Sequence, residues 1–154
     1  MIIKPEEMKV SKSLKKSVLN KGFVIKSNEN FEAVMRNCSN IKRKHEDSTW
    51  ISEEFIQAYT DLHHLDIAFS IECYLDEELV GGLYGLLIGD VFCGESMFAK
   101  VTDASKVAFY HLCQQAEKNG IKLIDCQVYN DHLASLGAHE ITREDYFKIL
   151  KESF

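Results

Sequence analysis

The sequence predicts an α+β domain with a mixed, mainly antiparallel sheet and flanking helices. Three segments rich in β-branched and aromatic residues, 68–75, 79–88 and 91–96, are separated by short turns, which is typical of antiparallel hairpins. Segments with apolar residues at helical spacing stand before and after them. A chain of 154 residues, 45% hydrophobic and 27% charged, is long enough to build one such core.

The elements before the strands begin with a basic lead-in over residues 1–22. A helix is expected over 31–38, with Asn30 as its N-cap, and a second over 53–64 after Ser52, because Asn and Ser are favoured N-caps. The segment 39–48 between them is polar.

The elements after the strands begin with an amphipathic helix over 105–118. Asn119-Gly120 is expected to end it, because glycine readily takes the left-handed conformation of a C-terminal cap. A strand over 122–128 follows, in which Asp125 and Gln127 would face the same side. Short helices over 133–136 and 143–150 complete the predicted order.

Composition excludes several classes of protein. No apolar run approaches the ~20 residues that span a bilayer, and the acidic residues near the N-terminus do not fit a signal peptide. We therefore expect a soluble, cytoplasmic protein without membrane contact. The five Cys form no Cys-x-x-Cys pair, so neither a disulfide framework nor a metal site is predicted.

Charge is divided unevenly along the chain. Residues 1–50 hold 11 Lys and Arg against 6 Asp and Glu, whereas residues 51–154 hold 7 against 18. The basic residues gather in a lysine cluster (Lys12, Lys15, Lys16 and Lys21) and in a second group over 42–44. Such clusters can neutralise phosphates, although a solvated surface is the simpler interpretation for an acidic chain.

The order of strands, helix, strand and helix resembles the second half of the GNAT acyltransferase fold. GNAT enzymes cradle the pyrophosphate of coenzyme A in a glycine-rich turn before a helix. The corresponding turn here, 101–105, contains no glycine and adds Asp103. An acyl-CoA donor is therefore disfavoured, and no cofactor is predicted.

Several segments together resemble the leucyl/phenylalanyl-tRNA-protein transferase family. Their order and spacing agree with that family, strongly over 48–147 and weakly over 5–47. The matching residues are Thr49-Trp50-Ile51, Ala58-Tyr59 with Leu62-His63, Gly81-Gly82-Leu83-Tyr84-Gly85, Phe92 to Phe98, Ala104-Ser105-Lys106, Leu123 to Gln127, His132 and Ser135-Leu136-Gly137-Ala138.

The resemblance implies an enzyme that moves Leu or Phe, with Met as a further candidate, from aminoacyl-tRNA to a protein. The acceptor would be an N-terminal Lys or Arg, and the product would enter the N-degron degradation pathway. The alternative is a GNAT-like module that binds tRNA or basic N-termini without turnover, or only with a partner.

The same resemblance implies three catalytic residues. Gln127 would accept a hydrogen bond from the attacking amine, and Asp125 would orient or polarise that system. Glu95, at the end of an apolar strand, would hold the ammonium of the donor or the basic acceptor. From spacing alone, a hydrogen-bonded carboxylate in a strand-end turn is as good an interpretation of Asp125 as a catalytic role. For Glu95 the alternative is an acid at the edge of a strand.

The aminoacyl pocket and the tRNA site are implied in the same way. Trp50 would stack on the terminal adenine, with a core tryptophan as the alternative, and the lysine cluster would contact the acceptor stem. The His and Cys residues are interpreted as structural. Candidate pocket walls, several of which must also be core, are Leu83, Phe92, Met97, Phe109, Leu112 and Ile124.

The chain is shorter than the family pattern. Residues 1–47 are interpreted as the basic remnant of the family's N-terminal part, and 48–154 as the GNAT-like aminoacyltransferase domain. We expect aminoacyl-tRNA and acceptor proteins as partners. A homodimer or a second chain is the candidate replacement for the missing module.

Overall fold

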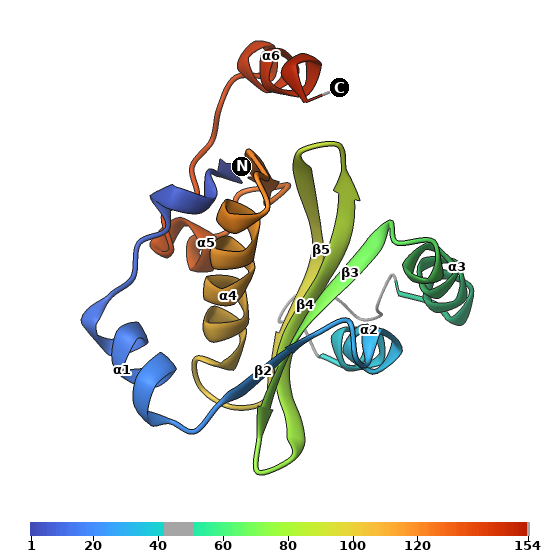
Figure 1. The fold of residues 1–154 in the computed structure, drawn as a ribbon, viewed down its shortest axis with the longest axis vertical. Coiled ribbons are helices and arrows are strands. Elements are labelled where there is room, and N and C mark those ends of the chain that lie inside the picture. Colours follow the sequence, from blue (N-terminus) through green and yellow to red (C-terminus); the bar gives the residue numbers. More distant parts are fainter. Residues whose placement is uncertain (42–50, 154) are drawn as a thin grey trace.

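The computed structural model describes residues 1–41 and 51–153, which form a six-stranded sheet flanked by helices (Figure 1). The strand order is β1-β6-β5-β4-β3-β2, and only β5 and β6 pair in parallel. The strands are β1 (Ile2–Ile3), β2 (Val24–Ser27), β3 (Ala68–Leu75), β4 (Glu78–Ile88), β5 (Val91–Ala99) and β6 (Leu123–Asp125).

Helices cover both faces of the sheet (Figure 1). On one face α4 packs with α1 over the largest apolar cluster, and on the other α2 and α3 cover a second cluster centred on Tyr84 and Phe98. The helices are α1 (Lys12–Asn20), α2 (Phe31–Ser39), α3 (Glu53–His64), α4 (Ala104–Lys118), α5 (Asp131–Ser135) and α6 (Arg143–Glu152), with a short 3-10 turn η1 (Pro5–Glu7).

The predicted class and the meander of β3, β4 and β5 are confirmed. Two predicted helix signals are also confirmed. The Ser52 hydroxyl accepts the Phe55 backbone N–H at 3.4 Å, and α4 ends at Lys118, with Asn119 as its C-cap and Gly120 following at φ +74°. Asn30 is the N-cap residue of α2 as predicted, but its side chain makes no capping hydrogen bond. The buried Glu72 carboxylate accepts the backbone N–H groups of Glu29 and Asn30 at the start of this helix.

The basic lead-in contains more structure than predicted. It forms β1 and α1, and β2 follows; both strands join the same sheet as the later ones. A two-residue strand such as β1 carries no periodic signal, so its pairing with β6 is set by tertiary contacts. The proposed boundary after residue 47 lies outside the described residues and stays a prediction.

The strand predicted over 122–128 is wrong in its second half, because β6 ends at Asp125. Gln127 has φ +62°, a left-handed conformation that extended strands do not contain. The chain therefore turns directly after Asp125, and this turn shapes the cavity described below.

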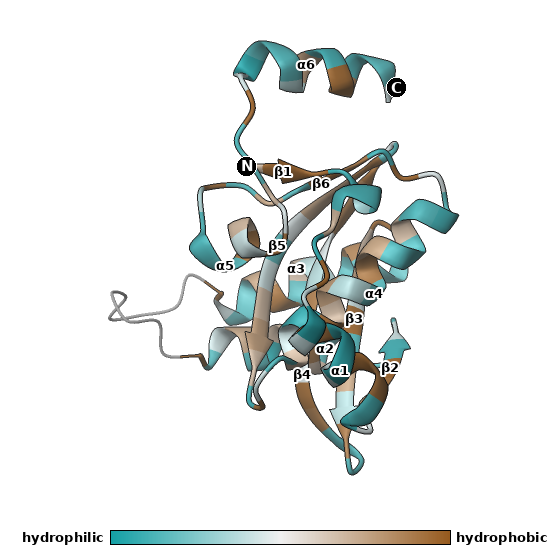
Figure 2. Cartoon of the chain, turned by 90° about the vertical axis from the view of Figure 1, so that its left-hand side faces the viewer, coloured by the Kyte–Doolittle hydropathy of each residue, from teal (hydrophilic) through white to brown (hydrophobic). Residues whose placement is uncertain are grey.

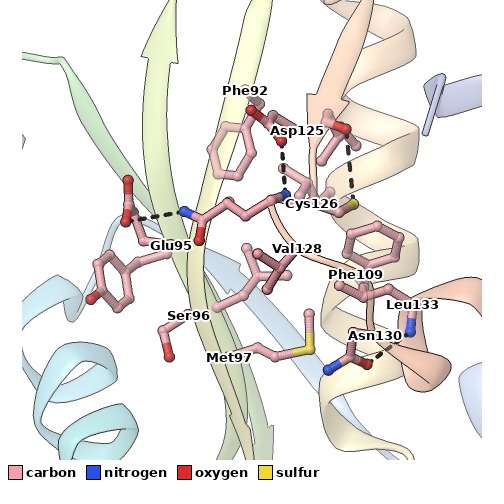
Figure 3. A pocket seen from close by; sticks show the side chains of 16 residues that line it. Phe92, Glu95, Ser96, Met97, Phe109, Asp125, Cys126, Val128, Asn130 and Leu133 are labelled. Carbon is pink, nitrogen blue, oxygen red and sulfur yellow. Dashed lines mark hydrogen bonds between the residues drawn. The ribbon is translucent and has the colours of Figure 1, made fainter. Parts of the chain in front are cut away.

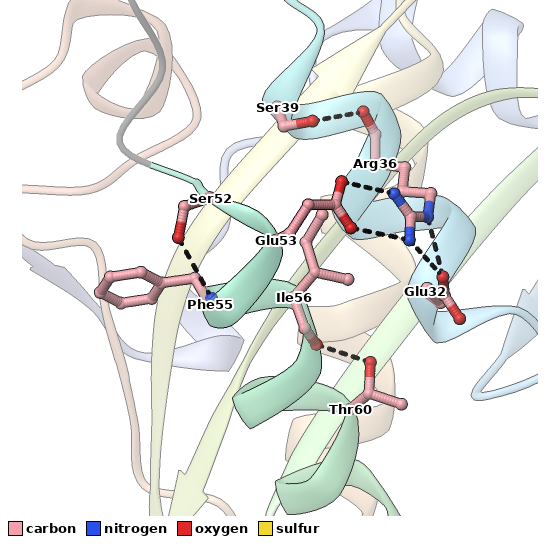
Figure 4. A network of polar contacts seen from close by, with 8 residues as sticks. All are labelled: Glu32, Arg36, Ser39, Ser52, Glu53, Phe55, Ile56 and Thr60. Carbon is pink, nitrogen blue, oxygen red and sulfur yellow. Dashed lines mark hydrogen bonds and ion pairs between the residues drawn. The ribbon is translucent and has the colours of Figure 1, made fainter.

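Ion pairs join α2 and α3, the two helices on the face of the sheet opposite α4 (Figure 4). Arg36 of α2 contacts Glu53 of α3 with two nitrogens, at 2.9 and 3.1 Å, and also Glu32 within its own helix at 2.7 Å. All three side chains are largely exposed, so the bridge orients the helices more than it stabilises them.

Hydropathy follows these layers. The strands at the centre are coloured hydrophobic along much of their length, whereas α6 is mostly hydrophilic (Figure 2). Within 1–41 and 51–153, no helix is both long and apolar enough to cross a bilayer.

Candidate active site

A cavity of about 400 Å³ opens where β5 and β6 separate (Figure 3). The two strands pair only over Val91–Cys93 and Leu123–Asp125, and the segments that follow diverge. The structure brings all six predicted pocket residues around this one cavity. Its lining comprises Leu83, Phe92, Met97, Phe109, Leu112 and Ile124, together with Glu95, Asp125, Gln127 and neighbours such as Ser96, Val128, Asn130 and Leu133.

A β-bulge at Glu95 shapes one wall. Tyr84 pairs with Ser96 and Gly85 with Gly94, so Glu95 is an additional residue without a partner on β4. In a regular strand, residues five apart face opposite sides, yet Phe92 and Met97 both line the cavity because the bulge lies between them. The bulge also turns the Glu95 carboxylate towards the opening (Figure 3).

The cavity has an apolar floor and a polar mouth on opposite faces of the sheet. Phe92 and Ile124 are register partners and pack in the cluster beneath α4. Cys93 and Asp125 are the next partners, and Cys93 packs on the opposite face with residues of α6. Because side chains alternate along a strand, the apolar floor faces α4 and the Asp125 carboxylate faces α6.

Asp125 holds the turn that carries Gln127. Its Oδ1 atom accepts the backbone N–H of Gln127 at 2.8 Å, and its Oδ2 atom accepts the hydroxyl of Tyr146 at 2.8 Å. The Cys126 N–H also donates to the carbonyl of Met1, directly before β1, at 2.9 Å. These two hydrogen bonds hold the turn that leads into Gln127.

The side chain of Gln127 crosses the mouth of the cavity to Glu95. Its Nε2 atom donates to Glu95 Oε2 at 3.4 Å. This bond orients the amide and leaves Oε1, which has no hydrogen-bond partner among the described residues, available to accept a further N–H.

Glu95 is half-buried, and burial raises its pKa above the usual value of 4.5. Hydrogen bonds from Gln127 and Tyr59 favour the ionised form and act in the opposite direction, while the nearby Asp125 charge adds to the rise. Burial and the Glu95 charge in turn raise the pKa of Tyr59 to about 12. Tyr59 is therefore a neutral donor at neutral pH.

The cavity supplies no activated thiol. Burial raises the pKa of Cys126 to about 12 and also raises that of Cys93, so both remain protonated at neutral pH. Burial lowers the pKa of His132, which bonds to neither thiol. His63 stacks on Phe31 with 4.5 Å between ring centroids and contacts the Ala68 carbonyl, consistent with a structural role.

The N-cap position of α4 is occupied by an acidic residue, Asp103, whose side chain makes no capping hydrogen bond. Asp103, with φ +72°, accepts the Ser17 hydroxyl at 2.8 Å and pairs with Lys21 at 3.2 Å and Lys106 at 3.6 Å. The Ser17 hydrogen bond and the two lysines lower the pKa of Asp103. An acid at this position repels the anion that a helix N-terminus would otherwise attract.

The lysine cluster predicted to bind tRNA contributes no residue to the cavity lining. Lys12, Lys15 and Lys16 are exposed on α1, while Lys21 follows α1 and is engaged with Asp103. Trp50 and the basic group 42–44 fall outside the described residues. The roles of all these residues remain predictions.

Sequence reasoning assigned no role to three residues that the structure brings to the site. Tyr59 donates to Glu95, Tyr146 donates to Asp125, and Asn130 lines the cavity. Tyr59 belonged to the matched pattern Ala58-Tyr59, which was the available signal. No sequence signal pointed to Tyr146, because its contact with Asp125 depends on how α6 packs against the sheet.

Comparison with known proteins agrees with this geometry. The sequence model of the family described as leucyl/phenylalanyl-tRNA protein transferase matches residues 2–151. The chain belongs to this family. It is 52% identical over 151 residues to the leucyl/phenylalanyl-tRNA–protein transferase of Flavobacterium johnsoniae, covering 98% of this chain and 71% of that protein. A relative of the same name from Nitrosospira multiformis is 49% identical over 99% of this chain and 65% of its own length. Family membership therefore makes the chain one of a group of aminoacyltransferases.

Solved structures of acetyltransferases share the fold. An aminoglycoside acetyltransferase from an uncultured soil sample aligns with a TM-score of 0.60 at 13% identity, covering 80% of this chain and 94% of that one. A predicted acetyltransferase from Clostridium acetobutylicum, solved with acetyl-CoA, aligns with a TM-score of 0.58 at 9% identity. The alignment covers 79% of this chain and 92% of that one. The predicted GNAT-like fold is thereby confirmed.

Proposed function

We propose that this chain moves Leu or Phe, with Met as a further candidate donor, from aminoacyl-tRNA to the α-amine of an N-terminal Lys or Arg. The observation that carries the proposal is one cavity with an apolar floor and a mouth formed by Glu95, Asp125 and Gln127. Family membership supports it. The reaction would take place in the cytoplasm, and its product would be marked for degradation in the N-degron pathway.

The apolar floor suits an uncharged donor side chain. Phe92, Met97 and Phe109 present aromatic and thioether groups, which adapt to both branched and aromatic partners. A pocket of this kind rejects charged side chains but distinguishes poorly among apolar ones, at ~1–3 kcal/mol per methylene. Leu, Phe and Met are therefore the expected donors.

The polar mouth suits attack by an amine on an ester. The amine nitrogen bonds to the ester carbonyl carbon, the carbon–oxygen bond to the terminal ribose breaks, and the amine's proton ends on the released ribose oxygen. Gln127 Oε1 would accept an N–H from the amine and direct its lone pair at the carbonyl. Asp125 would act through the Gln127 turn that it holds. The ester is already activated, so no covalent nucleophile is needed.

Glu95 would supply a negative charge for a substrate cation. The donor's α-ammonium and the side chain of the basic acceptor are the two candidates. Its half-buried position strengthens that attraction relative to an exposed acid. The lysine cluster on α1 and Trp50 would bind the tRNA.

The test is transfer of labelled Leu from leucyl-tRNA to a peptide that begins with Arg, at low salt. Transfer should occur with the purified chain, fail with an acetylated peptide N-terminus, and fall strongly in Gln127→Ala. Undiminished transfer by Gln127→Ala would refute the assigned role. A folded chain that binds tRNA or Arg-initiated peptide without transfer would favour a binding module. A rate that rises more than linearly with protein concentration would indicate a homodimer.

A further inference from the structure

The last helix reaches the candidate active site through one side chain. The Tyr146 hydroxyl of α6 donates to Asp125 Oδ2 at 2.8 Å in a partly buried position. Burial and the hydrogen bond to Asp125 raise the pKa of Tyr146, so the phenol keeps its proton for this bond. The contact joins two residues that are 21 positions apart in the chain.

α6 is seated on the sheet by a small set of contacts. Ile149 and Leu150 pack against the apolar cluster of Ile2, Val91 and Leu123. The Lys122 ammonium donates to the carbonyl of Glu152 at 2.8 Å. These contacts place Tyr146 beside Asp125, on the face of the sheet opposite α4. Figure 1 shows α6 beyond the end of the sheet where the N-terminus lies.

The Asp125 carboxylate therefore bridges α6 and the Gln127 turn. One oxygen receives the phenol, and the other receives the Gln127 backbone N–H at 2.8 Å. A carboxylate fixed at both oxygens cannot rotate about its side-chain torsions without breaking one bond.

The turn that it holds is a strained one. A non-glycine residue with φ +62° costs about 1 kcal/mol or more and persists only where its surroundings impose it. Such strain concentrates at functional sites. Here it aims the Gln127 amide across the cavity mouth to Glu95.

We propose that Tyr146 is a positioning residue, whose hydroxyl fixes Asp125 so that Asp125 holds Gln127 in its left-handed, substrate-facing conformation. The inference rests on the proposed function of Gln127. It makes α6 part of the catalytic apparatus, although α6 contributes no residue to the cavity lining. A purely structural Tyr146 would need only its ring, because the ring provides the packing.

The test compares Tyr146→Phe with the wild type in the transfer assay. The substitution keeps the ring and removes the hydroxyl. We expect kcat to fall about ten- to hundredfold, as for loss of one hydrogen bond to a charged group, with KM for leucyl-tRNA within about twofold. The matched control is Tyr110→Phe, which removes a phenol that bonds Gln114 on the exposed side of α4 and should change neither constant.

A second readout does not depend on activity. In amide NMR spectra of the full chain, Tyr146→Phe should shift the Gln127 backbone N–H resonance, because the acceptor of that N–H is no longer fixed. Tyr110→Phe should leave it in place. Tyr146→Ala should lower the melting temperature as well, whereas Tyr146→Phe should restore the melting temperature without restoring kcat.

Wild-type kcat in Tyr146→Phe, or an unmoved Gln127 resonance, would overturn the inference. An effect on KM alone would also overturn it, since it would place Tyr146 in binding. If the wild type shows no transfer, the proposed function fails, and the Gln127 resonance still decides whether Tyr146 positions the turn.

Discussion

Replacing Glu95 by glutamine removes one negative charge from the mouth of the cavity and keeps the shape of the side chain. The change should lower activity, whereas it should leave stability at neutral pH unchanged or higher. Glu95 lies on the bulge of β5, half-buried, with hydrogen bonds from Gln127 and Tyr59. Its charge is the group proposed to attract a substrate cation.

The expected loss of activity follows from the partial burial. Two unit charges 4 Å apart attract by about 4 kcal/mol at an effective dielectric constant of 20 and about 1 kcal/mol in water. A half-buried carboxylate lies between these limits, so the loss should be about 2 kcal/mol, or roughly thirtyfold in kcat/KM.

The effect on stability has the other sign. Burial raises the pKa of Glu95 in the folded state above the usual 4.5, so the folded protein binds this proton more tightly than the unfolded chain. Its contribution to stability is therefore present at low pH and is lost as the pH rises through the raised value. Glu95→Gln should remove this dependence and leave the melting temperature at neutral pH unchanged or higher.

The assay is transfer of Leu to an Arg-initiated peptide, with thermal melts of the same samples at several pH values. Glu117→Gln is the matched control, because Glu117 is an exposed acid on α4 outside the cavity. Glu95→Gln with wild-type kcat/KM would refute the charge argument. A marked drop in its melting temperature at neutral pH would refute the burial argument.

Three further predictions test the geometry around Glu95. Tyr59→Phe removes a hydrogen bond that favours ionised Glu95, so the pKa of Glu95 should rise further. The acid limb of the pH–rate profile should then move to higher pH. Met97→Phe narrows the cavity and should lower transfer of Phe more than that of Leu, by about tenfold in their ratio of kcat/KM. Gly85→Ala should destabilise the fold by several kcal/mol, because its Cβ would clash with the backbone carbonyl oxygen of Cys93 and lie 2.7 Å from the Phe92 ring, beside the bulge. A pH–rate profile tests Tyr59→Phe, competition between the two donors tests Met97→Phe, and a denaturant titration tests Gly85→Ala.

Each of these has a contrary result. An acid limb that moves to lower pH in Tyr59→Phe would reverse the role given to that hydrogen bond. Equal losses of Leu and Phe transfer in Met97→Phe would remove Met97 from the donor pocket. Wild-type stability in Gly85→Ala would mean that β4 and β5 are not packed as described.

The sequence was sufficient for the strands and helices of the central part of the chain. The meander follows from the alternation of residues 68–96 and its two short turns, and α3 and α4 from Ser52 and Gly120 at their ends. The lead-in was under-predicted because the apolar stripe of α1 is short, with Leu14 and Ser17 buried among lysines. The strand β1 gains its conformation by pairing with β6 and has no local signal.

All six predicted pocket residues and the three predicted catalytic residues line one cavity, and their roles stay predictions. The geometry of the cavity was not predicted, because spacing alone would have put Phe92 and Met97 on opposite faces. The bulge at Glu95 and the turn at Gln127 are local departures from strand geometry imposed by tertiary contacts. Tyr146 could not be found from the sequence, because only the docking of α6 brings it to Asp125.

In the proposed reaction, the cavity receives an aminoacyl group from tRNA and delivers it to a basic N-terminus. Mass spectrometry of an Arg-initiated peptide, incubated with the chain, leucyl-tRNA and acetyl-CoA together, tests this directly. We expect a peptide longer by one N-terminal Leu, formed by the wild type and lost in Gln127→Ala. An acetylated peptide, or an unmodified one from a folded sample, would contradict it.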